Sequence, residues 1–152
     1  MTKRETRKLT DIVNEVKLTL ASEHGIGEDQ LKSYRQRVDA SELTFPRGSM
    51  MVPIEQLWID YTVQRDVIIK HIISILKRYD PRLCAPASAC TEQFDIENQQ
   101  YPIFTYDGQH RTIATALLGY DKIPLIVVET ADPTFSSYAF EECNMSTKKL
   151  GP

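Results

Sequence analysis

The segment Tyr106-Asp107-Gly108-Gln109-His110-Arg111-Thr112 lies between the apolar run Pro102-Ile103-Phe104 and an Ala- and Leu-rich stretch from Ala114 to Leu118. An apolar run, a glycine and a helical pattern in this order predict a strand, a tight junction and a helix. A glycine at such a junction lets the backbone approach a ligand closely, and the first turn of a helix offers unpaired N–H groups to an anion. The polar side chains around the junction therefore indicate a binding site.

A hairpin turn at Asp107-Gly108, followed by a surface helix, is the alternative interpretation of this segment. The residues that follow favour the strand-to-helix junction. Apolar residues recur there at helical spacing until a glycine ends the pattern: Ile113, Ala114, Leu117, Leu118 and Gly119.

The chain has 152 residues, which fits one domain of about 100 to 200 residues. Hydrophobic residues make up 41% and charged residues 26%, as in an ordinary folded protein. No apolar run approaches the roughly 20 residues that span a bilayer, and the basic start of the chain has no apolar signal core behind it. We therefore expect a cytoplasmic protein with no membrane partner, in the host cytoplasm if the source is viral. The net charge of −3 gives the whole molecule little attraction to nucleic acid, which leaves that role to a local basic patch.

Three cysteines, Cys84, Cys90 and Cys143, contain no close C-x-x-C pair and leave one thiol over from any disulfide. We expect reduced, buried thiols. The three histidines have no metal-like spacing to the cysteines, which argues against a zinc site.

The first 47 residues form a predicted N-terminal helical extension. Its first helix, from about residue 4 to 22, is expected to lie with one face on the body, because its apolar residues recur at helical spacing. Gly25 and Gly27 end this helix, and a second one begins near residues 27 to 29. The apolar positions of the first helix are Leu9, Ile12, Val13, Val16 and Leu20.

Residues 48–152 form a predicted α/β body. A short strand is expected over 50–59, with Pro53 marking an edge or an end of the strand. A helix with a wide apolar face follows over 66–79. The remaining predicted elements are a hairpin of strands 83–89 and 100–106 joined by 95–99, a helix 110–118, a central strand 123–129 and a last helix 135–143.

Four stretches of the body occur in an order that resembles a known superfamily: Thr62-Val63-Gln64-Arg65-Asp66 before a helix, Asp107-Gly108-Gln109-His110-Arg111 after a strand, Gly119 followed by Ile123 to Val128, and Asn144 to Leu150. On these stretches, residues 50–152 resemble the ParB/sulfiredoxin-like superfamily and are most similar to phage and bacterial proteins that carry the DGQHR signature. The resemblance implies an α+β fold in which helices surround a mixed sheet, with the helical extension added at its N-terminus.

The resemblance also implies a nucleotide-binding domain that acts on or with DNA, with CTP or ATP and Mg²⁺ as ligands and with nucleotide hydrolysis or nuclease activity as options. Physical reasoning is compatible, since helix-start amides, the Arg111 guanidinium and the Thr112 hydroxyl are all suited to an anion. A buried Arg65–Asp107 ion pair is the structural alternative. The residues assigned to phosphate binding are Gln64, Arg65, Gly108, Gln109, His110, Arg111 and Thr112.

His110 and Asp107 are the candidate catalytic residues. His110 titrates near neutrality beside the expected anion, so it is either an acid–base group or a hydrogen-bonding strut. Asp107 either caps the helix through its carboxylate or binds a metal that accompanies a phosphate. Glu141, together with Glu142, and Asn144 resemble the acidic-and-amide segment through which ParB-type proteins hold magnesium.

The chain also departs from these relatives. Sulfiredoxins have a reactive cysteine where this chain has Gln109, so sulfinic acid reduction is not expected. No helix-turn-helix DNA reader of the partition ParB type can be identified. A second hypothesis therefore stays open, in which the protein is a non-enzymatic adaptor or inhibitor that binds a protein partner or a second copy through residues 1–45.

Overall fold

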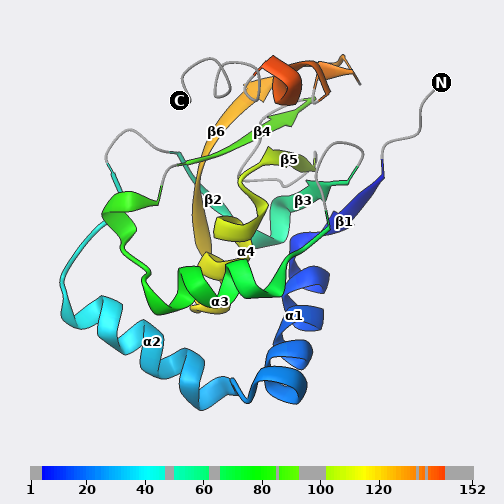
Figure 1. Cartoon of the computed structure of the whole chain (residues 1–152). Coiled ribbons are helices and arrows are strands. Elements are labelled where there is room, and N and C mark those ends of the chain that lie inside the picture. Colours follow the sequence, from blue (N-terminus) through cyan, green and yellow to red (C-terminus); the bar gives the residue numbers. More distant parts are fainter. Residues whose placement is uncertain are drawn as a thin grey trace, which may run out of the picture.

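The computed structural model describes residues 5–46, 50–61, 66–84, 86–92, 102–132, 134–135 and 137–142. Within these residues, six strands form one mixed sheet in the order β1-β3-β5-β4-β6-β2 (Figure 1). Two pairs, β3/β5 and β4/β6, are parallel, and the other three are antiparallel. The strands are β1 (Thr6–Lys8), β2 (Met50–Pro53), β3 (Leu57–Asp60), β4 (Ala87–Thr91), β5 (Ile103–Asp107) and β6 (Lys122–Glu129). The predicted α+β class with a mixed sheet is confirmed.

Helices cover one face of this sheet. In Figure 1, α3 and α4 lie below the strands, α1 forms the lower right of the molecule and α2 its lower left. Helix α4 contacts α1, α3, β4 and β6, so it lies at the centre of the packing. The helices are α1 (Leu9–His24), α2 (Glu28–Ala40), α3 (Ile69–Lys77) and α4 (Gln109–Leu117), with 3₁₀ turns η1 (Ile54–Gln56) and η2 (Pro81–Leu83). None of the described helices is long and apolar enough to cross a membrane.

Helix α1 packs its apolar face into the same core as the strands, as predicted. All five of its apolar positions named above are buried there. The prediction that this helix begins near residue 4 is wrong, because residues 6–8 form β1 at the edge of the sheet. Thr6–Lys8 contains no apolar residue, and its conformation is set by hydrogen bonding to β3, a tertiary partner that local periodicity cannot detect. The domain boundary predicted after residue 47 falls in residues 47–49, outside the described part.

The single strand predicted over 50–59 is instead two strands on distant parts of the sheet. β2 pairs with β6 at one edge, while β3 lies between β1 and β5. The η1 turn lies between them and begins directly after Pro53. As predicted, Pro53 ends an edge strand, where its missing N–H costs no ladder bond.

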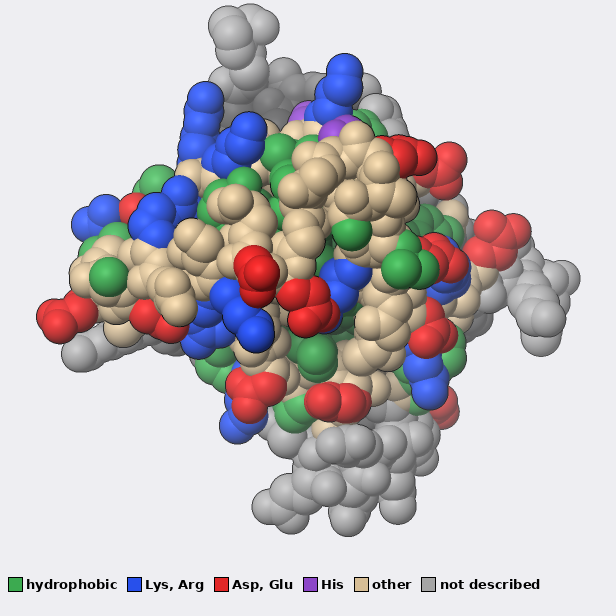
Figure 2. Space-filling view, turned by 90° about the horizontal axis from the view of Figure 1, so that it is seen from below, with side chains coloured by type: hydrophobic (Ala, Val, Ile, Leu, Met, Phe, Trp, Pro, Cys, Tyr) green, Lys and Arg blue, Asp and Glu red, His purple; other side chains and the backbone are tan. Residues whose placement is uncertain are grey.

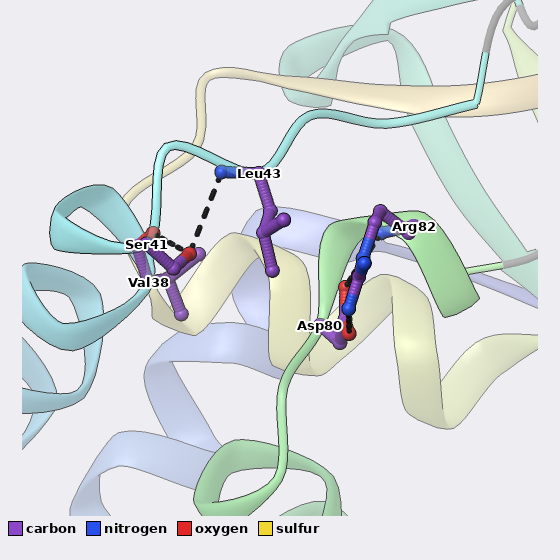
Figure 3. A network of polar contacts seen from close by, with 5 residues as sticks. All are labelled: Val38, Ser41, Leu43, Asp80 and Arg82. Carbon is purple, nitrogen blue, oxygen red and sulfur yellow. Dashed lines mark hydrogen bonds and ion pairs between the residues drawn. The ribbon is translucent and has the colours of Figure 1, made fainter.

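The hairpin of β4 and β5 is confirmed as an antiparallel pair, and its connecting loop lies outside the described residues. Its first strand starts later than predicted, because residues 81–83 form η2 rather than a strand. The Asp80 carboxylate accepts from the Arg82 N–H at 3.0 Å and pairs with the Arg82 guanidinium at 2.8 Å (Figure 3). An N-terminal aspartate followed by proline stabilises such a turn.

The later elements follow the sequence pattern closely. Helix α4 begins one residue before its predicted start, and Gly119 follows it with φ +86°. β6 is an interior strand between β4 and the edge strand β2, but it lies one position from the edge and not at the predicted centre of the sheet. The described residues 135 and 137–142 have helical backbone, within the predicted last helix. Cys84 and Cys90 are buried, reduced cysteines, as expected, and Cys143 lies outside the described residues.

Helix α2 is held to the ends of α3 and α4 by two arginines. The Arg35 guanidinium donates to the Leu118 carbonyl at 3.1 Å and stacks over the Tyr120 ring at 3.6 Å. Arg37 donates to the carbonyls of Leu76 and Lys77 at the end of α3. A cation at a helix C-terminus satisfies carbonyls that have no partner within the helix and complements the helix dipole. Beyond α2, Ser41 Oγ donates to the Val38 carbonyl at 2.5 Å and accepts from the Leu43 N–H at 3.4 Å (Figure 3).

The variant Arg35→Ala is expected to lower the free energy of unfolding by about 1 to 2 kcal/mol, since it removes one partly buried hydrogen bond and one cation–π contact. Urea unfolding measures this change. Lys32→Ala, an exposed substitution on the same helix, serves as the control and should change stability by less than about 0.5 kcal/mol. Equal effects of the two substitutions would contradict a clamp at Arg35.

Candidate functional site

The junction between β5 and α4 requires a glycine for two reasons. Gly108 has φ +88°, a left-handed conformation that other residues rarely adopt. A Cβ atom at this position would lie 3.0 Å from the Cβ and 3.2 Å from the Cα of Ala87 in β4. The backbone therefore turns tightly against the neighbouring strand and passes directly into the first turn of α4.

This turn opens onto a hollow of about 380 Å³. Five of the predicted site residues, Asp107 to Arg111, line it together. The other lining residues are His71 and Ile75 from α3 and Phe140 from the last helical segment. Sequence analysis missed these three, because nothing local to them indicates that α3 and the last helical segment meet at the DGQHR turn.

Thr112, the other described residue assigned to phosphate binding, faces the interior instead. It is 1% exposed, and its hydroxyl donates to the Gly108 carbonyl at 2.8 Å. This bond stabilises the first turn of α4. Thr112 therefore does not present its hydroxyl to the hollow.

The first turn of α4 presents backbone donors at the hollow. The Thr112 N–H donates to the Gly108 carbonyl at 3.1 Å, which is the first main-chain bond of the helix. The N–H groups of His110 and Arg111 precede this bond and have no acceptor within the helix. They carry the positive end of the helix dipole.

Arg111 adds a full positive charge. Its side chain is exposed, and its guanidinium forms no hydrogen bond or ion pair with any described residue. The Asp107 carboxylate is likewise unpaired within the described part of the chain, so it neither caps α4 nor pairs with Arg111. Arg111 and Ile75 also line a second hollow of about 210 Å³, which extends along α3 to Tyr79 and Cys84.

His110 joins α4 to the start of α3. Its Nε2 accepts a hydrogen bond from the Ile68 N–H at 2.9 Å, so the proton of the neutral ring resides on Nδ1. Its ring meets the His71 ring edge-to-face, with 5.3 Å between the centroids. Burial, followed by the nearby His71, lowers the pKa of His110. The geometry is that of the hydrogen-bonding strut, and Nε2 is not free to act as a base while this bond is made.

The lowered pKa of His110 predicts a pH dependence of stability. As the pH falls below the ordinary histidine value of 6.5, the unfolded chain binds a proton that the folded chain resists. Stability is therefore complete above about 6.5 and decreases as the pH falls toward the lower pKa of the folded state. Urea unfolding at pH 5.5 and 7.5, roughly one unit either side of this value, measures the free energy of unfolding at each pH. We expect this free energy to differ less between the two pH values in His110→Gln than in the wild type.

The His24→Gln variant, at the exposed end of α1, is the control for removing a histidine elsewhere. If the free energy of unfolding of His110→Gln changed between the two pH values as much as that of the wild type, the prediction would be contradicted.

The His110–Ile68 contact also brings two helix starts together. Ile68 directly precedes α3, and His110 lies in the first turn of α4.

Figure 2 shows the helical face from below, where Lys and Arg side chains are interspersed with Asp and Glu, and the visible histidine side chains lie at one edge beside a basic side chain. No single sign of charge dominates this face. Any attraction of an anion must therefore come from local donors.

Several predicted site residues are not tested by these contacts. Gln64, Arg65 and Asn144 lie outside the described residues, and so does the alternative Arg65–Asp107 ion pair. Glu141 is exposed and does not line the hollow. Among the described residues, no group of three or more His, Cys, Asp or Glu side chains is placed to hold a metal ion.

Comparison with solved structures finds a likeness to the crystal structure of the C-terminally truncated chromosome-partitioning protein ParB from Caulobacter crescentus complexed with CTP-gamma-S. The two are 22% identical with a TM-score of 0.47, over 65% of this chain and 53% of that one. The chain thus spans about half the length of the ParB chain that it matches. No family model matches the sequence, and a search of curated proteins finds no match.

Proposed function

We propose that the hollow at the β5–α4 junction binds the phosphate groups of a nucleotide. The observation that carries this proposal is the Arg111 guanidinium, a cation beside the first-turn amides of α4 that pairs with no described residue. A guanidinium can hold a phosphate through two parallel hydrogen bonds, and helix-start amides add further donors at little cost. Each hydrogen bond to a charged group contributes about 1.5 to 3 kcal/mol.

The dimensions of the site are compatible with a nucleotide. The hollow of about 380 Å³ falls within the range of about 300 to 1,000 Å³ that is usual for small-molecule sites. The second hollow shares Ile75 and Arg111 with the first and gives room for a base and sugar. By resemblance to ParB-like proteins, we expect CTP or ATP with Mg²⁺ as the ligand, and we assign Gln64 and Arg65, which lie outside the described residues, to the same phosphate groups.

We propose that the site binds its ligand with little or no turnover. Among the described residues that line the hollow, Asp107 is the one carboxylate, so metal-assisted phosphodiester cleavage is not supported there. The Nε2 atom of His110 is already engaged by Ile68.

The adaptor hypothesis receives no support from α1. Its apolar face, which a partner would have to contact, is already buried in the core of this chain. The apolar face of α1 is therefore not available to a partner in the folded chain, and an adaptor role would have to use other surfaces of residues 1–45.

Calorimetric titration tests the proposal, with CTP, ATP and GTP each in the presence of Mg²⁺, with pyrophosphate, and with a short single-stranded DNA. We expect binding heat with at least one nucleotide and with pyrophosphate. The affinity should decrease as salt is added, because salt screens the charges. Heat with DNA alone would identify a nucleic-acid backbone as the ligand instead. No heat with any of these compounds would contradict the proposal.

A further inference from the structure

We propose that His110 is a proton-operated latch that holds the first turn of α3 against the first turn of α4 and thereby controls the hollow. The latch is closed when the imidazole is neutral and open when it is protonated. Its coupling to an anion, described below, rests on the proposed function.

The closed state follows from the hydrogen bond between Ile68 and His110. The Ile68 N–H donates to Nε2, and only an unprotonated nitrogen can accept it. Protonation places a hydrogen on Nε2, so that two donors face each other across 2.9 Å and the bond is lost. The amide at the start of α3 is then released.

The groups around His110 act on its protonation in both directions, and burial together with the nearby His71 lowers its pKa when no anion is present. From α3, the His71 ring lies 5.3 Å away, and from α4 itself the charged Arg111 follows in sequence. β5 contributes Asp107 at the rim of the hollow, and the segment before α3 carries exposed Asp66; these two carboxylates favour the protonated ring. The last helical segment contributes the uncharged Phe140. Partial burial of the imidazole disfavours its charge further, in agreement with the lowered pKa.

An anion in the hollow reverses this balance. It supplies a negative charge beside the imidazole, which favours the protonated ring, and the protonated Nε2 becomes a donor. Anion binding is then accompanied by proton uptake, and by reciprocity the anion raises the pKa of His110.

Nuclear magnetic resonance of the full chain tests the latch without any ligand. We expect hydrogen exchange at the Ile68 amide, corrected for its intrinsic pH dependence, to accelerate up to about tenfold as the His110 ring nitrogens titrate, the factor expected for loss of one hydrogen bond. In His110→Gln, which keeps an acceptor but cannot take up a proton, this acceleration should disappear. It should persist in His71→Gln and in the remote His24→Gln. Constant exchange across the titration, or the same acceleration in His110→Gln, overturns the latch.

Calorimetry with sulfate, whose charge does not change over this pH range, tests the coupling. Titrations in two buffers of different protonation enthalpy should show that the wild type takes up protons and that His110→Gln takes up fewer. Sulfate binding without that difference overturns the coupling. A protein that shows the pH-dependent Ile68 exchange but binds neither sulfate nor nucleotide overturns the proposed function and the coupling, and supports the latch.

Discussion

Replacing Gly108 with alanine is expected to lower the free energy of unfolding by about 3 kcal/mol and to abolish phosphate binding. The left-handed backbone costs an alanine roughly 1 to 2 kcal/mol. The new Cβ would meet Ala87 at 3.0 Å, and forcing an extra carbon into packed structure adds about 1 to 3 kcal/mol. Relief of this clash moves the first turn of α4 away from β4, which displaces the donors of the hollow. Urea unfolding and pyrophosphate calorimetry measure the two effects.

Gly119→Ala is the matched control for this substitution. Gly119 has nearly the same φ, +86°, but among the described residues a Cβ there would have only the Arg35 Nη1 within 4 Å, at 3.9 Å. This variant should therefore lose only roughly 1 to 2 kcal/mol of unfolding free energy, the cost of placing alanine in a left-handed conformation, and the hollow should stay intact. Equal losses of stability and of phosphate binding in the two variants would show that the close approach of Gly108 to Ala87 contributes nothing to either property.

Replacing Arg111 with glutamine is expected to weaken phosphate binding by about tenfold to a hundredfold, the effect of losing one or two charge-assisted hydrogen bonds. The fold should be unaffected, within about 0.5 kcal/mol, because the side chain is exposed and has no partner among the described residues. Calorimetry with pyrophosphate and urea unfolding distinguish these outcomes.

Lys32→Gln removes the same charge from α2, whose residues do not line the hollow. It should leave phosphate affinity within about twofold of the wild type, because a screened charge outside the site contributes little. Similar losses for Lys32→Gln and Arg111→Gln would mean that net charge, and not the site, attracts the anion.

The junction at Gly108 could be predicted from sequence because its determinants are local. An apolar strand, a glycine and a helical repeat occupy consecutive positions, and the structure places all five residues from Asp107 to Arg111 at one hollow. The apolar repeat of α1 was equally informative about which face is buried.

The parts that the sequence did not predict depend on distant partners. Thr6–Lys8 is a strand because β3 pairs with it, and the segment over 50–59 divides because its halves pair with β6 and with β5. The role of His110 depends on an amide 42 residues earlier in the chain. Local pattern shows that a histidine follows Gly108, but not which group will face it.

The central claim is that the first turn of α4 binds a phosphate, and backbone amide resonances during titration with pyrophosphate and with CTP and Mg²⁺ test it most directly. We predict that the largest shifts are at the amides of Gln109, His110 and Arg111 and at the Arg111 side-chain Nε, and that they saturate together. Saturating shifts elsewhere in the chain, with these four signals unmoved, would contradict the account.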